Sequence, residues 1–200
     1  LVRGKDYLVV GKSNGIDFFN RRGAKISSTQ LSKGELNKDL NFLKGNTKEN
    51  SFYTTTNNLG EIVILSLGSK LRVENYGSWS KNHKFIGDDL LGNGRLNYVF
   101  LDGDKLFLFD YQGGVIFSFK FIAPVNGNVF LHRLPGGRNT IGVNAILEDQ
   151  IYLFTTDGNL YPGFPLKGST PFSIGDLGIS NSVNLVVGSQ DNYLYFYRLN

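Results

Sequence analysis

Short apolar runs alternate with polar turns along the chain, and one such unit recurs from one end to the other. The clearest copy spans residues 184–197, NLVVGSQDNYLYFY, in which a polar turn joins an apolar run to an aromatic run. In successive copies the second run opens 43–46 residues further on, at Ile16, Ile62, Leu106, Ile151 and Leu194. A nearly constant period of this length predicts a repeat protein.

A glycine after the second run marks the register of the repeat. It occurs every 45 residues, at Gly23, Gly68, Gly113 and Gly158. Glycine tolerates the positive φ of a tight turn, so these positions predict turns between strands. The pattern predicts a single domain over residues 1–200, with repeats at about 6–50, 51–96, 97–140 and 141–183 and a half repeat at 184–200.

The repeats are expected to consist of short strands with little helix, because no long helical period is present. Alternation of apolar runs and turns predicts strands at 8–10, 16–19, 24–28, 52–55, 61–65, 70–75, 105–109, 115–121, 141–147 and 151–155. Two further strands are predicted near residues 40–43 and 84–87, in the connections between repeats.

Several strands are apolar on both faces, which decides how the repeats must be arranged. Residues 106–109, LFLF, and 194–197, LYFY, do not alternate with polar residues, so their sheets are expected to be covered above and below. Four-stranded antiparallel units of about 45 residues meet this condition when they stack around an axis, as the blades of a β-propeller do. The sequence therefore predicts an all-β propeller.

The first hairpin is expected to lack an innermost strand and the last an outermost one. The chain is thus predicted to be a partial propeller or one of about five blades. Unpaired strands at both ends would invite edge pairing, which favours an arc of a ring with six to eight blades. A chain that begins with Leu rather than Met also looks like a piece of a longer protein.

Composition narrows the classes of function. A chain with 40% hydrophobic and 14% aromatic residues can bury a substantial core, and the absence of Cys excludes disulfides and thiol chemistry. No apolar run approaches the roughly 18 residues that span a bilayer. The net charge of +4 comes from residues 1–50, where Lys and Arg lie mostly in turns, so nucleic-acid binding is not expected.

Three segments carry a resemblance to a known group of repeats. Asp176 and Leu177 precede the copy at 184–197, and TTDGNLYPGFPL at 155–166 follows the hairpin of the fourth repeat. Together with residues 85–110, these segments resemble bacterial propeller repeats of the FG-GAP and quinoprotein-like (PQQ-like, WD40-like) type. The resemblance implies architecture more than activity, because such folds host many functions.

The same resemblance implies a candidate calcium loop. Residues 89–97 are similar to the calcium loop of some FG-GAP repeats, with Asp89, Asn93 and Asn97 at the first, fifth and ninth ligand positions. Leu91 stands at the third position, where an oxygen ligand is expected. The alternative is that Asp89, like Asp176, forms a turn by accepting backbone N–H bonds.

Catalytic chemistry finds little support in the sequence. His83 and His132 are the only histidines and have no HxH, HExxH or G-x-S-x-G motif beside them. Trp79 is the sole Trp and lies in a polar connection, whereas a quinoprotein dehydrogenase needs a stacking Trp platform. No catalytic residue and no cofactor other than calcium is predicted, so the protein is not expected to be an enzyme.

The predicted function is a noncatalytic propeller scaffold that binds another protein, in an exported bacterial protein of the periplasm or cell surface. A carbohydrate-binding propeller is the alternative, because Tyr193, Tyr195 and Tyr197 could stack on sugars if exposed. Packing between blades is the other role of aromatics at alternate strand positions. A third alternative is part of a propeller enzyme whose active site lies in further blades.

Overall fold

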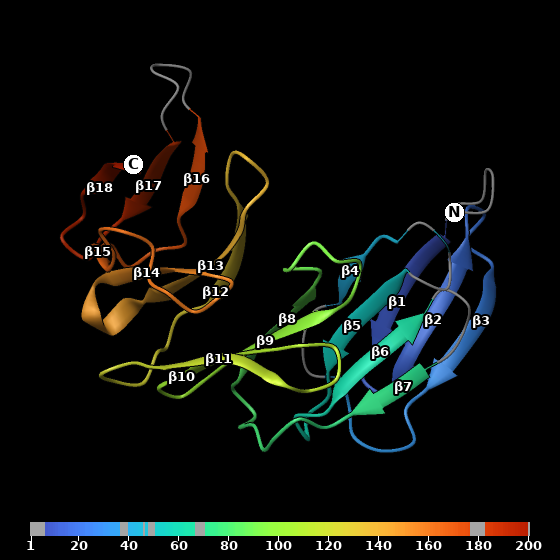
Figure 1. Ribbon diagram of the computed structural model, residues 1–200. Helices are drawn as coiled ribbons and strands as arrows, with labels where there is room; N and C mark the ends of the chain where they lie inside the picture. The colour runs from blue at the N-terminus through green and yellow to red at the C-terminus, as the bar shows by residue number, and fades with distance from the viewer. Residues whose placement is uncertain are drawn as a thin grey trace. The chain divides into compact units, whose positions relative to one another are not determined.

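The computed structural model describes residues 7–36, 40–45, 47, 51–66, 71–176 and 183–199. This part of the chain is nearly all β, with 55% strand and no α-helix. One turn of 3₁₀ helix, η1 (Ile146–Glu148), lies between two strands. The strands form five antiparallel sheets of three or four strands each (Figure 1).

The sheets follow one another in chain order. The first is β1 (Tyr7–Lys12), β2 (Gly15–Asn20) and β3 (Lys25–Gln30), and the second is β4 (Asn41–Leu43), β5 (Phe52–Thr56), β6 (Ile62–Ser66) and β7 (Leu71–Glu74). The third is β8 (Lys84–Asp88), β9 (Asn97–Asp102), β10 (Lys105–Phe109) and β11 (Val115–Lys120). The fourth is β12 (Val129–Arg133), β13 (Asn139–Ala145), β14 (Gln150–Thr155) and β15 (Leu166–Lys167), and the fifth is β16 (Ser173–Asp176), β17 (Val183–Gly188) and β18 (Leu194–Leu199).

The all-β prediction is confirmed, and so are most of the strands. The strands expected near residues 40–43 and 84–87 are β4 and β8, which pair with the strands that follow them. Gly23, Gly113 and Gly158 have φ of 74°, 86° and 90°, as their turns require, whereas Gly68 lies outside the described residues. The first and last sheets hold three described strands, as expected.

One predicted strand ends early. The strand expected over 141–147 stops at Ala145, because residues 146–148 turn as η1 and Asp149 follows with a φ of 50°. The Asp149 N–H donates to the Ile146 carbonyl at 3.2 Å and closes this turn.

The chain forms two compact units, Leu1–Tyr98 and Val99–Asn200. The single domain and the repeat bounds given above stay predictions.

Within the first unit, one face of each sheet packs on the sheet that follows. Ile16 and Phe18 of β2 form a buried cluster with Leu65 of β6, against which Tyr53 of β5 also packs. From the second sheet, the Thr54 hydroxyl donates to the Gly87 carbonyl of β8 at 3.4 Å. We call the face that packs on the following sheet the forward face, and the opposite face the rear face.

The second unit repeats this arrangement with larger side chains. Phe119 on the forward face of the third sheet lies with its ring centroid 4.8 Å from Phe154 on the rear face of the fourth. On the forward face of the fourth sheet, Ile151 and Leu153 are fully buried in a cluster that includes Leu185 of the fifth. Successive sheets within each unit are therefore joined by apolar contacts between a forward and a rear face.

The prediction that both faces of residues 194–197 are covered is wrong. The side chains of residues 106–109 are buried or half-buried, as expected. In contrast, Leu194 and Phe196 on the forward face of the last sheet are 59% and 63% exposed. The two runs have similar sequences, but among the described residues a sheet covers the forward face only of the first run.

Candidate functional site

The loop between β8 and β9 contains the calcium candidates and closes on its own hydrogen bonds. Asp89 accepts the N–H of Asn93 through Oδ1 at 3.0 Å and that of Gly94 through Oδ2 at 2.8 Å. Asn97, which is buried, accepts the N–H of Leu90 at 3.1 Å. Asp89 thus has the turn-forming role that the sequence also allowed, and Asn97 accepts a backbone N–H in the same loop. Calcium binding stays a prediction.

We expect Asp89→Ala to lower the free energy of unfolding by about 1–2 kcal/mol, because two backbone N–H groups lose a charged acceptor. If Asp89 only accepts backbone N–H bonds and holds no calcium, the loss of stability measured by thermal melting is the same with calcium and with a chelator. Asn93→Ala serves as the matched control, because it removes a candidate ligand but keeps both N–H bonds to Asp89. A calcium-dependent rise in Tm that both variants abolish would establish a calcium site instead.

The two histidines lie in different surroundings, His83 among polar groups and His132 among apolar ones. The residues that the structure describes contain no group of three or more His, Cys, Asp or Glu side chains able to hold a metal. His83 is fully buried, with Nδ1 2.6 Å from the Ser80 carbonyl and Nε2 2.8 Å from the Thr56 hydroxyl. Because a carbonyl can only accept, Nδ1 carries the proton and Nε2 accepts from Thr56. His83 therefore ties a loop to β5.

His132 on β12 is enclosed by apolar groups. Its ring stacks on Phe172 with centroids 4.7 Å apart, and Nε2 is buried without a hydrogen-bond partner. A Cβ at Gly142 would lie only 2.9 Å from Nε2, which explains the glycine on the neighbouring strand. Burial lowers the pKa of His132 to about 4, so the ring is neutral at pH 7.

Trp79 is a packing residue. A Cβ at Gly60 would lie 3.0 Å from its Cβ, and one at Gly77 would lie 3.1 Å from its indole ring. The indole thus lies against two glycine positions that leave space for it, in the polar connection between β7 and β8.

Part of the basic excess of the first repeat is engaged in ion pairs. Lys12 and Lys25 lie 2.8 Å and 3.0 Å from the carboxylate of Asp17, which is buried on β2. Hydrogen bonds from Lys12, Ser28 and Lys25 hold the pKa of Asp17 well below its usual range. Lys33 pairs in the same way with Glu61 at 2.7 Å. These lysines stabilise carboxylates of their own unit.

A polar network holds the turn of the β17–β18 hairpin to the fourth sheet. Asp149 accepts the Ser189 hydroxyl at 2.6 Å, and Lys167 lies 2.6 Å from Asp191. Burial alone would raise the pKa of Asp149, but hydrogen bonds from Ser189 and Gln190 outweigh it and lower this pKa. The hydrogen bond from Lys167 likewise holds the pKa of Asp191 well below its usual range. The hairpin is therefore fixed in place.

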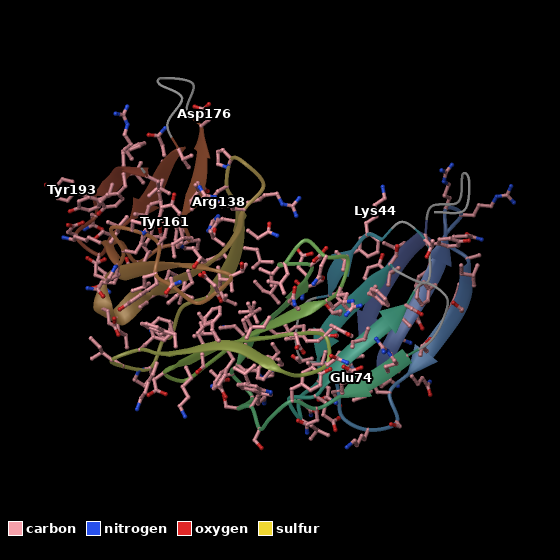
Figure 2. All side chains as sticks on the ribbon, in the orientation of Figure 1. Lys44, Glu74, Arg138, Tyr161, Asp176 and Tyr193 are labelled. Carbon is pink, nitrogen blue, oxygen red and sulfur yellow. The ribbon has the colours of Figure 1, made fainter. Side chains whose placement is uncertain are left out.

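The three tyrosines of the last hairpin have different roles. Tyr195 donates to Asp191 at 2.7 Å and Tyr197 to the Lys167 carbonyl at 3.0 Å, and their rings stack on the rear face of the sheet. Tyr193 is 69% exposed and lies at the outer edge of the last sheet (Figure 2). Packing accounts for Tyr195 and Tyr197, and Tyr193 alone of the three presents an open ring.

The forward face of the last sheet is the candidate functional site. Leu194 and Phe196 of β18 point to this face, and Val186 of β17 lies directly opposite Phe196 in the ladder. An apolar patch on a sheet that is fixed from behind is typical of a surface that binds a partner. We call Leu194, Phe196 and Val186 the open face.

Comparison with known proteins supports the fold and leaves the activity open. No protein-family model and no curated protein matches the sequence. No helix among the described residues has the length and apolar character needed to cross a membrane.

Three solved structures illustrate the likeness in fold. BBS1N in complex with ARL6DN has a TM-score of 0.61 at 15% identity over 96% of this chain and 61% of its own. BamB from Moraxella catarrhalis has a TM-score of 0.53 at 13% identity over 96% of this chain and 57% of its own. The dihydro-heme d1 dehydrogenase NirN has a TM-score of 0.63 at 12% identity over 99% of this chain and 43% of its own.

The chain is therefore a β-propeller protein with antiparallel blades, and the resemblance to PQQ-like and WD40-like repeats is confirmed at the level of the fold. It spans less than two thirds of the length of each of the three structures. Their names include a complex with a protein partner and a dehydrogenase, so the fold is compatible with both binding and catalysis.

Proposed function

We propose that the chain is a noncatalytic propeller scaffold that binds another protein through the open face. The observation that carries this proposal is the exposure of Leu194 and Phe196 on a sheet whose other face is buried. Large apolar side chains on a rigid strand bind a partner with little loss of conformational entropy, because the strand is already ordered. Aromatic anchors of this kind dominate the energy of protein interfaces.

A binding role also fits the groups around the open face. The titratable groups Asp149, Lys167 and Asp191, which hold the turn of the same hairpin, contact one another and Ser189 and so stabilise the hairpin. Among the solved structures, the complex of BBS1N with ARL6DN is one in which a similar fold holds a protein partner. The proposed setting is an exported bacterial protein, a proposal that rests on the resemblance to bacterial propeller repeats.

The test is affinity capture with two matched variants. Leu194→Ser/Phe196→Ser removes both anchors of the open face, whereas Val115→Ser/Ile122→Ser changes two apolar residues that are 57% and 96% exposed elsewhere. We expect a captured protein to bind the first variant about 100-fold more weakly than the wild type when the affinity is measured with purified components. The second variant is expected to bind normally. Equal binding of the captured protein by the wild type and both variants would show that the open face does not bind it.

A further inference from the structure

One ring nitrogen of His132, Nε2, is buried on β12 without a hydrogen-bond partner. Buried polar atoms of folded proteins are nearly always paired, so an unpaired one needs an explanation. Phe172 covers this nitrogen, since Phe172 is 5% exposed and its ring stacks on that of His132. A Cβ at Gly142 would lie 2.6 Å from the Phe172 ring and 2.9 Å from Nε2. The Phe172 ring and the nitrogen therefore lie side by side above this glycine.

The described segments that surround the His132 ring supply no charge to balance a proton. β13 contains no charged residue, and neither does the connection 168–172 between β15 and β16. Arg133 follows His132 on β12, so its side chain points to the opposite face of the strand. Lys167, just before the connection, pairs with Asp191. Burial is accordingly the cause that lowers the pKa of His132 to about 4.

Protonation changes what the surroundings of Nε2 must provide. Both nitrogens of an imidazolium ring are donors, so the Nε2–H of the charged ring is buried without an acceptor while Phe172 covers it. β13 is paired on both sides, with β12 and with β14, which holds Gly142 in place. Phe172 lies in a connection without regular secondary structure. Of the two groups that cover Nε2, Phe172 is thus the one that can move away.

We infer that the contact between His132 and Phe172 is an acid-sensitive switch. Protonation of His132 displaces Phe172 and opens the connection 168–172, while the strands of the fourth sheet stay paired. Because this connection leads into β16, opening loosens the attachment of the fifth sheet to the fourth. The inference does not depend on the proposed function.

The switch operates at acid pH. The pKa of His132 is about 4 when Phe172 covers the ring and is expected to be about 6.5 when water reaches it. The neutral ring therefore stabilises the closed arrangement fully above about pH 6.5, and this contribution is lost as the pH falls towards 4. From pH 7 to about pH 4.5, the population of the open arrangement should rise by about 50-fold.

An NMR titration tests the coupling directly, because His83 and His132 are the only histidines and give one imidazole Cε1–H signal each. We expect Phe172→Ala to raise the pKa of His132 by at least about one unit, a tenfold change in proton affinity. Phe164→Ala removes another buried ring of the same cluster, one that packs on Tyr161, and should leave this pKa unchanged. An unchanged pKa of His132 in Phe172→Ala would overturn the inference.

Hydrogen exchange tests whether the opening is local. After correction for the intrinsic effect of pH, the amides of residues 170–176 should lose about 50-fold in protection between pH 7 and about pH 4.5, whereas those of β9 and β10 keep theirs. His132→Phe has no proton to gain and should keep the protection of residues 170–176. Unchanged protection of these residues in the wild type would overturn the inference, and so would an equal loss in His132→Phe or in β9 and β10.

Discussion

Phe154→Ala should lower the free energy of unfolding by about 3–5 kcal/mol, the largest loss that we predict for one substitution in this chain. Phe154 is completely buried on the rear face of the fourth sheet. Its ring lies 4.8 Å from Phe119 and 6.1 Å from Phe117, both on the third sheet. Truncation removes these contacts and leaves a cavity between two sheets that are already folded around it.

Equilibrium denaturation with urea measures this loss, at a concentration at which the chain is monomeric. Phe196→Ala is the matched control, because it removes the same side chain from an exposed position of the last sheet. The control is expected to change stability by less than about 0.5 kcal/mol. Equal losses for the two variants would contradict the packing of the third sheet on the fourth.

Acidification should destabilise the protein through His132, by roughly 2–3 kcal/mol between pH 7 and about pH 4. The pKa of His132 is about 4 in the folded chain, below the value of about 6.5 expected when the chain unfolds. Between these values the unfolded state binds more protons than the folded state. The contribution of His132 is therefore fully present above pH 6.5 and is lost as the pH falls towards 4.

His132→Phe isolates this effect. Phenylalanine keeps an aromatic ring against Phe172 but has no proton to gain, so the variant should lose less stability than the wild type over the same range. Asp17 and Asp191 have lowered pKa values, so their contributions to stability are lost as the pH falls from the usual range of carboxylates to values below it. Both residues are present in the wild type and in the variant, so this loss is common to the two proteins. Parallel stability curves from pH 7 to pH 4 would exclude His132 as the source.

The sequence predicted the strands because local signals define them. The hairpin of β17 and β18 follows directly from two apolar runs and a polar turn. The innermost strand β12 was missed, because VFLHR contains two polar residues and follows a long connection. Its place in the fourth sheet depends on pairing with β13, which a local pattern does not reveal.

The candidate site was only partly predictable. LFLF at 106–109 and LYFY at 194–197 give the same pattern, but the first run is mostly buried, whereas Leu194 and Phe196 are exposed among the described residues. The contact of Asp149 with Ser189 joins residues forty positions apart and depends on the stacking of two sheets. For the Asp89 loop, the sequence allowed both calcium ligation and a turn in which Asp89 accepts backbone N–H groups, and the structure contains the hydrogen bonds of that turn.

The central claim is that, within each unit, a sheet covers the forward face of the one before it, and that Leu194 and Phe196 are exposed on the forward face of the last described sheet. Because the chain has no Cys, single cysteines can report on this directly by their rate of reaction with a thiol reagent. We expect cysteines replacing Leu194 and Phe196 to react about 100-fold faster or more than cysteines replacing Ile151 and Leu153, which should react only when the structure opens. Equal rates at the two pairs of positions would contradict the account.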